Sequence, residues 1–403
     1  MEQGSWYRQR VFLFLGAALG IRLILAAFVY GYPADMGCFS GWSEHLVKVG
    51  FSRFYSGEIF ADYPPGYMYP LFLIGMLRNA LRIPFNSGVY LILVKFPALL
   101  ADVVLAYFLY RVGENHVGHR AGFYLALAFA FNPAVILNSA LWGQIDSFFM
   151  IPLVVGVFLL AEGKIEWSVL GWMLAFLTKP QALFFAPLWI FVLLERKDVG
   201  VFLRGVLTGF LTFVLLSFPF SGPMTVLRIY RGTIGSYPYA SLNAFNLMAL
   251  LGGNWMPDET KFLFLSYRYW GYVGILVTIL WSAFFFFRIK GKERVYATAS
   301  SLAVSVFFLA PRMHERYLFP ALFFILLWYL FEPKRKILFL YAGLSVTFFV
   351  NVGLVLLLAL LYEMYHIARF DGWLLCTSAA NGVLWGLLLS YTLKKVKSEG
   401  TVR

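Results

Sequence analysis

The sequence predicts an all-α protein that crosses a membrane with about twelve helices. Of its 403 residues, 61% are hydrophobic and 20% aromatic, and only 13% are charged, whereas soluble domains carry about a quarter charged residues. The mean hydropathy is +0.75. Because backbone polar groups in hydrocarbon must pair within their own segment, each long apolar stretch is expected to be a helix. The strand alternation of a membrane barrel is absent, and the soluble classes are excluded.

Residues 1–403 are expected to form a single transmembrane domain. The first apolar segment carries Arg22 and exceeds the length of a cleaved signal sequence, so it is interpreted as a retained span. Boundaries follow from where apolar stretches give way to polar or turn-forming residues. The predicted spans are 11–30, 89–110, 121–139, 147–161, 167–178, 182–194, 201–219, 267–287, 296–310, 317–331, 337–361 and 373–393.

Basic residues indicate the orientation of these spans. Lys and Arg gather in short loops at 111–120, 196–197, 288–294 and 334–336 and in the C-terminal tail, and the positive-inside rule places such loops in the cytoplasm. All of them fall on that side only if the short apolar stretch 66–81 does not cross, so we expect it to lie half-buried on the external side. Both termini are then cytoplasmic. The formal net charge of +13 therefore reflects topology, and no nucleic-acid partner is expected.

The first external loop, 31–88, carries the most suggestive polar residue. Asp35 follows the end of the first span by a few residues, at the mouth of the protein, where a carboxylate can act as a general base. The alternative is an ordinary solvated acid. Glu44, Asp62 and Tyr63 share this loop and are candidate substrate-binding residues, because two prolines after Tyr63 hold the backbone extended at the membrane surface.

Two external junctions add further polar groups. Trp142, Gln144 and Asp146 lie between the third and fourth spans, and Lys179 and Gln181 lie between the fifth and sixth. Bland interpretations exist for three of them: Asp146 can cap a helix, Trp142 can anchor at the interface, and Lys179 can extend toward water. The functional interpretation is that these groups face one cavity, where Lys179 binds an anion and the others bind substrate.

The segment PRMHERY contains the strongest external basic cluster, Arg312, His314 and Arg316. If the segment is helical, the two arginines share a face. Guanidinium groups present planar forks of donors that suit phosphate or diphosphate. The alternative is an interfacial charge cluster balanced by Glu315, but a short external loop should be poor in bases.

The second large external loop, 221–266, mixes aromatic residues, glycines and Asn243, a candidate substrate-binding residue. Apolar positions across 242–251 predict an amphipathic helix lying on the membrane. Within the bundle, Arg22 and Asp102 are expected to form a structural ion pair. Cysteines and histidines form no metal-binding pattern, and no nucleotide motif is present, so no metal or cofactor is expected.

These motifs together resemble a known family. Asp35, DYPP at 62–65, WGQIDS at 142–147, KPQ at 179–181 and MHERY at 313–317 occur in this order on one face. They resemble the GT-C superfamily of integral-membrane glycosyltransferases, especially its bacterial and archaeal mannosyltransferase-like members, over roughly residues 8–330. The resemblance implies two membrane-parallel helices in the first external loop. It also implies transfer of a sugar from a polyprenyl-phosphate carrier with inversion and usually without metal.

The resemblance makes Asp35 the general base on the acceptor hydroxyl, with Arg312, His314, Arg316 and Lys179 on the donor phosphate. The expected activity is that of a hexosyltransferase, with mannose favoured over glucose, at the external face of the cell membrane. The acceptor is a glycan, a lipid or a protein. Met36 follows Asp35, so no paired acid for a metal is present. The alternative is a flippase for a lipid-linked glycan, which would need polar residues along a path through the bundle.

Overall fold

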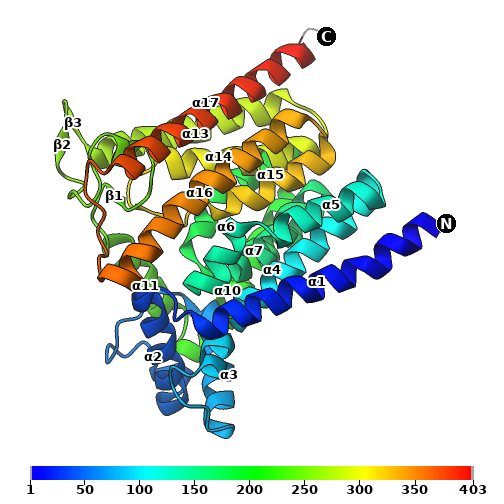
Figure 1. Ribbon diagram of the computed structural model, residues 1–403. Coiled ribbons are helices and arrows are strands. Elements are labelled where there is room, and N and C mark those ends of the chain that lie inside the picture. The colour runs from blue at the N-terminus through cyan, green and yellow to red at the C-terminus, as the bar shows by residue number, and fades with distance from the viewer. Residues whose placement is uncertain (1, 401–403) are drawn as a thin grey trace.

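The computed structural model describes residues 2–400 and shows a nearly all-α protein. Most helices run in a common direction as a bundle (Figure 1). The first helix, α1 (Glu2–Phe28), begins at the same end of the bundle at which the last, α17 (Gly372–Gly400), finishes. Loops, short strands and two crossing helices gather at the opposite end. Arg403, in the predicted cytoplasmic tail, lies outside the described residues.

Every one of the predicted apolar ranges falls on helical structure, although several helices are shorter than a full span. The remaining bundle helices are α4 (Gly88–His116), α5 (His119–Ala130), α6 (Pro133–Ile136), α7 (Asp146–Ala161), α8 (Ile165–Thr178), α9 (Ala186–Arg196), α10 (Val199–Ser217), α13 (Tyr267–Arg288), α14 (Glu293–Leu309), α15 (Phe319–Phe331) and α16 (Arg335–Tyr362). Single-turn elements extend some of them: η3 (Leu137–Trp142), η4 (Pro180–Phe185) and η5 (Phe218–Phe220).

Six helices in residues 2–400 are long and apolar enough to cross a membrane: α1, α4, α10, α13, α16 and α17. A seventh results if α5 and the following α6–η3 segment, bent by 44°, form one span. The helices α7, α8 and α15 are apolar but shorter. At 14 residues, α8 is about 21 Å long, against a hydrocarbon thickness of about 30 Å. The helical membrane-type fold is confirmed, and the twelve crossings remain a prediction.

The bend after α5 brings a polar segment to the end of the bundle opposite the termini. Asn132 caps the new helix through Oδ1, which accepts from Ala134 N at 2.9 Å, and a proline follows it. The π-helical turn η3 then ends at Gly143, whose φ of +90° favours glycine. A Cβ on Gly143 would lie 2.7 Å from Met36 Sδ, so this turn also packs closely on the first external helix. Lys95 Nζ donates to the freed carbonyl of Ala140 at 3.0 Å.

The predicted ion pair between Arg22 and Asp102 is confirmed. Arg22 Nε lies 2.6 Å from Asp102 Oδ2, and both side chains are fully buried. Ser139 Oγ donates to the same oxygen at 2.6 Å, and Ser147 Oγ donates to Oδ1. One carboxylate thus joins α1, α4, the η3 turn and α7.

Replacing Asp102 with leucine should lower the free energy of unfolding by about 3–5 kcal/mol, because it leaves the Arg22 charge buried without its partner. Substituting both residues, as Arg22→Met with Asp102→Leu, should recover most of the loss, since no unpaired charge remains. Thermal unfolding in detergent compares the variants. Equal destabilisation by the single and double substitutions would contradict this account.

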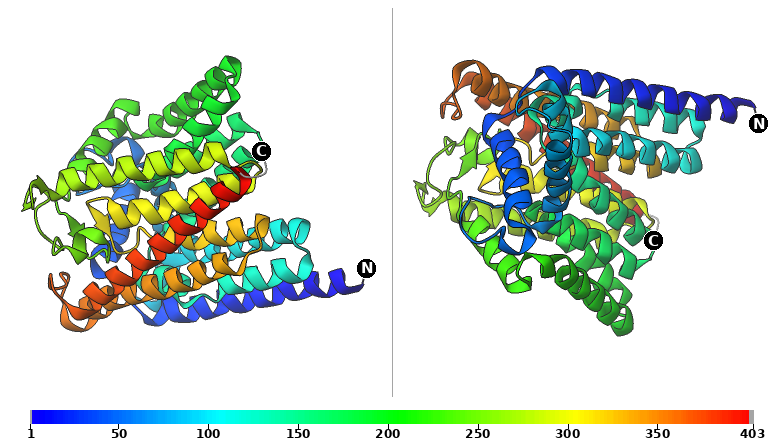
Figure 2. Two further views of the ribbon diagram at one scale, coloured as in Figure 1. Left: turned by 90° about the horizontal axis from the view of Figure 1, so that it is seen from above. Right: turned by 90° about the horizontal axis from the view of Figure 1, so that it is seen from below.

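The loop predicted to be the first external one packs against the bundle, where Gly66 lies close to Leu177 of α8. It comprises α2 (Pro33–Val49), a turn η1 (Phe51–Arg53), a turn η2 (Pro65–Tyr67) and α3 (Met68–Ala80). Figure 2 shows α2 and α3 running across the direction of the bundle helices. They approach closely, because a Cβ on Gly75 would lie 2.6 Å from Ser43 O. The stretch 66–81 therefore packs against α2 as a short helix, and its place relative to the membrane stays a prediction.

The second external loop differs from its prediction. Its helix α11 (Pro223–Gly235) precedes β1 (Ser241–Leu242), which pairs in parallel with β4 (Met313–His314), and α12 covers only Leu247–Leu250. Strands β2 (Lys261–Phe262) and β3 (Leu265–Ser266) form an antiparallel hairpin. An amphipathic helix over 242–251 was the wrong prediction: apolar residues there face the protein interior, where Leu242, Phe245 and Met248 are buried.

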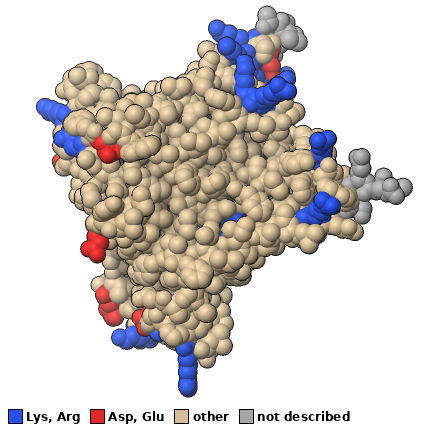
Figure 3. All heavy atoms as spheres, in the orientation of Figure 1, with Lys and Arg blue, Asp and Glu red and all other residues tan. Residues whose placement is uncertain are grey.

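Charge separates along the bundle as a membrane requires. In the view of Figure 3 the side of the bundle is almost free of charged atoms, and Lys, Arg, Asp and Glu gather toward its two ends. Ion pairs at the end with the termini include Arg8 with Glu114, Lys292 with Glu162 and Lys395 with Glu332. The uncharged band between the ends suits contact with hydrocarbon.

Candidate active site

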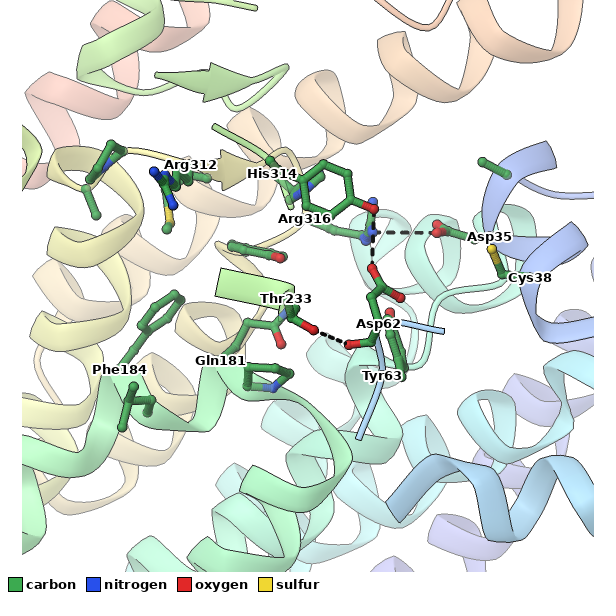
Figure 4. A pocket seen from close by; sticks show the side chains of 18 of the residues that line it. Asp35, Cys38, Asp62, Tyr63, Gln181, Phe184, Thr233, Arg312, His314 and Arg316 are labelled. Atoms are coloured by element: carbon green, nitrogen blue, oxygen red, sulfur yellow. Dashed lines mark hydrogen bonds and ion pairs between the residues drawn. The ribbon is translucent and has the colours of Figure 1, made fainter. Parts of the chain in front are cut away.

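A cavity of about 480 Å³ lies at the end of the bundle opposite the termini, between the loop predicted to be the first external one and the helices behind it (Figure 4). Its lining has two parts. One part is polar and comes from several segments that are far apart in the sequence, and the other is apolar and includes residues of η4 and α13. The polar part consists of Asp35, Asp62, Gln181, Thr233, Tyr237, Arg312, His314 and Arg316.

Asp35 lies in the first turn of α2, with its side chain 17% exposed. Its Oδ2 accepts two hydrogen bonds, from Trp142 Nε1 at 2.6 Å and from Gln144 Nε2 at 2.8 Å. Its Oδ1 lies 3.6 Å from Arg316 Nη2, which is too long for a hydrogen bond. One carboxylate oxygen is therefore held by the protein, and the other is available to a bound hydroxyl group.

Contacts across the chain fix the position of this carboxylate. Tyr32 N donates to Trp142 O at 2.9 Å, and the two rings stack with centroids 4.3 Å apart. Gln144 N donates to Asn138 O at 3.0 Å, which closes the turn that follows η3. The bend of the third predicted span therefore delivers both donors to Asp35.

Lys179 and Asp146 form a buried pair behind Gln144. Lys179 Nζ lies 2.6 Å from Asp146 Oδ1 and 3.0 Å from Gln144 Oε1, and its side chain is fully buried. Burial lowers the pKa of Lys179 below its ordinary value, although Asp146 opposes this. Asp146 begins α7 without capping it, and Asn138 Nδ2 donates to its Oδ2 at 3.1 Å. Because the two side chains pair with each other, Asp146 does not cap α7 and Lys179 does not extend toward water.

Arg316 is the cation closest to the base. Its guanidinium donates to Glu315, lies 5.4 Å from the Trp142 ring and is only 10% exposed. Its Nε is buried and has no hydrogen-bond partner in residues 2–400. Burial raises the pKa of Glu315, and the nearby Arg316 opposes the rise. Arg316 lines the cavity, so its positive charge is close to any anion bound there.

Arg312 does not share a face with Arg316, contrary to the prediction for a helical segment. Met313 and His314 are paired in β4, and Arg312 has a φ of +60°. Arg312 Nε donates to the buried Asp258 Oδ2 at 2.7 Å, and Arg268 Nη2 lies 2.8 Å from Asp258 Oδ1. Burial alone would raise the pKa of Asp258, but the hydrogen bonds from the two arginines lower it. Arg312 still lines the cavity, at a distinct position.

A second carboxylate, Asp62, faces the same cavity. Tyr237 Oη donates to its Oδ2 at 3.3 Å, and Thr233 Oγ1 donates to its backbone oxygen at 2.9 Å. Burial raises the pKa of Asp62, and the Tyr237 hydrogen bond opposes the rise only in part. Thr233 and Tyr237 were not anticipated from the sequence, because only tertiary packing brings the second external loop against the first. Tyr63, a predicted substrate-binding residue, also lines the cavity, with its Oη 3.4 Å from Gln144 Oε1.

Three other predicted substrate-binding residues, Gln181, Glu44 and Asn243, lie in different surroundings. Gln181 lines the cavity, and its Oε1 is buried without a hydrogen-bond partner in the described chain. Glu44 lies outside the site: its side chain is 56% exposed and 3.6 Å from Arg78 Nη1 on α3. Asn243 is structural, because its Oδ1 accepts from Trp255 Nε1 and its Nδ2 donates to Tyr365 O, both at 2.8 Å.

His314 should make stability depend on pH. Burial, with Arg316 and Lys179 nearby, lowers the pKa of His314 well below 6.5. The folded protein then keeps the ring neutral where the unfolded chain binds a proton, so stability falls as pH drops below about 6.5. Thermal unfolding in detergent should show a shallower loss over this range for His314→Gln than for wild type. Parallel curves would contradict the assignment.

No protein-family model matches this chain, and no curated protein matches it significantly. In residues 2–400 no group of three or more His, Cys, Asp and Glu side chains is placed to hold a metal ion. The cavity therefore offers the Asp35 carboxylate, the Arg316 guanidinium beside it, and apolar lining residues on η4 and α13.

Proposed function

We propose that this protein is an inverting glycosyltransferase of the GT-C type, a hexosyltransferase that takes its sugar from a polyprenyl-phosphate carrier. The observation that carries the proposal is the arrangement of Asp35. Its Oδ2 accepts from Trp142 and Gln144, and its Oδ1 lies beside Arg316 at 3.6 Å inside the cavity. A fixed base next to a cation suits removal of a proton while negative charge develops on a phosphate.

The proposed reaction is one displacement at the anomeric carbon. The acceptor hydroxyl gives its proton to Asp35 Oδ1 as its oxygen bonds to the anomeric carbon. The bond between that carbon and the phosphate oxygen breaks, and its electron pair leaves with the polyprenyl phosphate. Arg316 stabilises the leaving phosphate, with Arg312 and the neutral His314 as further donors along the same wall. A single displacement inverts the configuration of the sugar.

The apolar part of the cavity supports a lipid-linked donor. It is lined by Leu183 and Phe184 of η4 and by Tyr272 and Ile275 of α13. Leu183 is 51% and Tyr272 52% exposed, so the cavity reaches the outer surface of the bundle between these elements. A prenyl chain can lie along this surface in the membrane while its phosphate enters the polar part. A water-soluble nucleotide sugar would gain nothing from such an opening.

The same proposal includes the finer topology. We place twelve crossings in the membrane, with both termini cytoplasmic, the cavity external and α2 and α3 parallel to the membrane. The basic residues near the termini and the transverse direction of α2 and α3 support it (Figures 2 and 3). Mannose is the favoured sugar and glucose the second choice, and the acceptor is a glycan, lipid or protein.

A flippase fits less well. The charged groups inside the bundle are paired and packed: Arg22 binds Asp102, and Lys95 Nζ donates to Val29 O at 2.6 Å. They hold helices together and do not line the cavity described above. A transport path would need polar groups along a continuous route.

Reconstitution into vesicles separates the two functions. Vesicles with short-chain polyprenyl-phosphate mannose or glucose in both leaflets are mixed with candidate acceptors, and released polyprenyl phosphate is measured. A glycosyltransferase releases it and forms a glycosylated product. A flippase moves the donor between leaflets with the sugar still attached, and that result would overturn the proposal.

A further inference from the structure

The surroundings of Lys179 assign it a role other than binding the donor phosphate. We propose that Lys179 is a positioning residue: it fixes the side-chain amide of Gln144, which in turn orients Asp35 so that Oδ1 faces the cavity. This inference rests on the proposed function, since it concerns the base of that reaction. It replaces the role that the sequence suggested for this lysine.

Lys179 is out of reach of a bound donor. Its side chain is fully buried, and it is not among the residues that line the cavity, although its neighbours Pro180 and Gln181 are. Its ammonium group lies 2.6 Å from Asp146 Oδ1 and 3.0 Å from Gln144 Oε1. A phosphate would have to displace these partners to reach it.

Hydrogen bonds fix the orientation of the Gln144 side-chain amide. An ammonium group can only donate hydrogen bonds, so the atom facing Lys179 must be the oxygen. Two further donors point to the same oxygen, Ile145 N at 3.0 Å and Tyr63 Oη at 3.4 Å. With Oε1 held on this side, Nε2 is turned toward Asp35, where it donates at 2.8 Å.

The Gln144 amide in turn helps to orient the Asp35 carboxylate. Both Gln144 Nε2 and Trp142 Nε1 donate to Oδ2 of Asp35, which leaves Oδ1 for the acceptor hydroxyl. Without Lys179, the Gln144 amide loses the charged hydrogen-bond donor that holds Oε1 away from Asp35. A flipped amide would place an oxygen beside the carboxylate, and the two would repel each other. The chemical step should then slow while donor binding is preserved.

Kinetics with polyprenyl-phosphate mannose, or glucose if that is the better donor, test this role. Removing Lys179 alone would strand the Asp146 charge, so the variant is Lys179→Met combined with Asp146→Asn. We expect kcat to fall roughly 10- to 100-fold, the range known for losing residues that orient the ligands of a metal. The KM for the donor should stay within about twofold of wild type, because no donor contact is lost.

Gln144→Met supplies the matched comparison, because it leaves the Lys179–Asp146 pair intact and removes only the amide. It should lower kcat to a similar extent, and adding the Lys179 and Asp146 substitutions to it should change kcat little, since all three act through one hydrogen bond. Thermal unfolding confirms that each variant is folded.

The results distinguish a failure of the positioning role of Lys179 from a failure of the proposed function. A several-fold rise in donor KM with kcat retained, or an effect of Lys179 that persists in full in the Gln144→Met background, would overturn the positioning role alone. A folded wild-type protein that consumes neither donor with any acceptor would overturn the proposed function, and the role of Lys179 would fall with it.

Discussion

Replacing Asp35 with asparagine should lower the rate of sugar transfer by at least about 10²-fold, the lower end of what general bases contribute. The amide cannot take the proton of the acceptor. It can still accept from Trp142 and Gln144 through its oxygen, so the fold should be kept. Its nitrogen would then face the Arg316 guanidinium, donor against donor. The measurement is the transfer rate at saturating donor concentration.

Glu58→Gln is the matched control for this substitution. Glu58 lies in the same external loop, is exposed and does not line the cavity. The control removes one negative charge from the same surface and should leave the transfer rate unchanged. Asp35→Asn with wild-type activity would rule out the assignment of the base.

Replacing Arg316 with glutamine should be nearly as damaging, with a loss of about 10²–10³-fold in kcat/KM for the donor. This is the size seen when one donor to a developing negative charge is removed. Arg316 is the cation nearest Asp35, and it lines the cavity. Because the change also leaves Glu315 without its partner, folding must be checked by thermal unfolding.

Arg312→Gln provides the comparison, since Arg312 lines the cavity from a position held by Asp258. Asp258 keeps Arg268 in this variant, so the site should remain intact. We expect a smaller loss for Arg312→Gln than for Arg316→Gln. The reverse order would mean that Arg312 is the main phosphate ligand. Arg316→Lys should retain the fold and recover part of the activity, because it keeps the charge but loses the planar fork.

The positions of the apolar helices and the proximity of several polar residues could be predicted from the sequence. Apolar length is a local signal, and each apolar range predicted as a span falls on helical structure, whereas α3, within 66–81, is not among the helices long enough to cross a membrane. The polar junctions all face one side in the predicted topology, which is how Asp35, Gln144 and Arg316 could be expected to meet. The ion pair of Arg22 with Asp102 was predictable because buried charges within a membrane require partners.

The remaining features depend on tertiary contacts that leave no local pattern. Met313 and His314 pair with β1, more than seventy residues earlier, so the spacing of Arg312 and Arg316 does not place them on one helical face. The apolar residues of 242–251 suit a surface helix equally well, but they pack into the interior. Tyr237 reaches Asp62 only because α11 lies against the first loop. The burial of Lys179 likewise follows from packing, not from its place at a helix end.

The most direct test of the central claim is donor consumption by the purified protein. Wild type and Asp35→Asn are each incubated with short-chain polyprenyl-phosphate mannose and glucose, and the released polyprenyl phosphate is measured. The account predicts that wild type consumes at least one donor and that Asp35→Asn binds it without consuming it. Absence of both binding and consumption by a folded wild-type protein, or equal consumption by the variant, would contradict it.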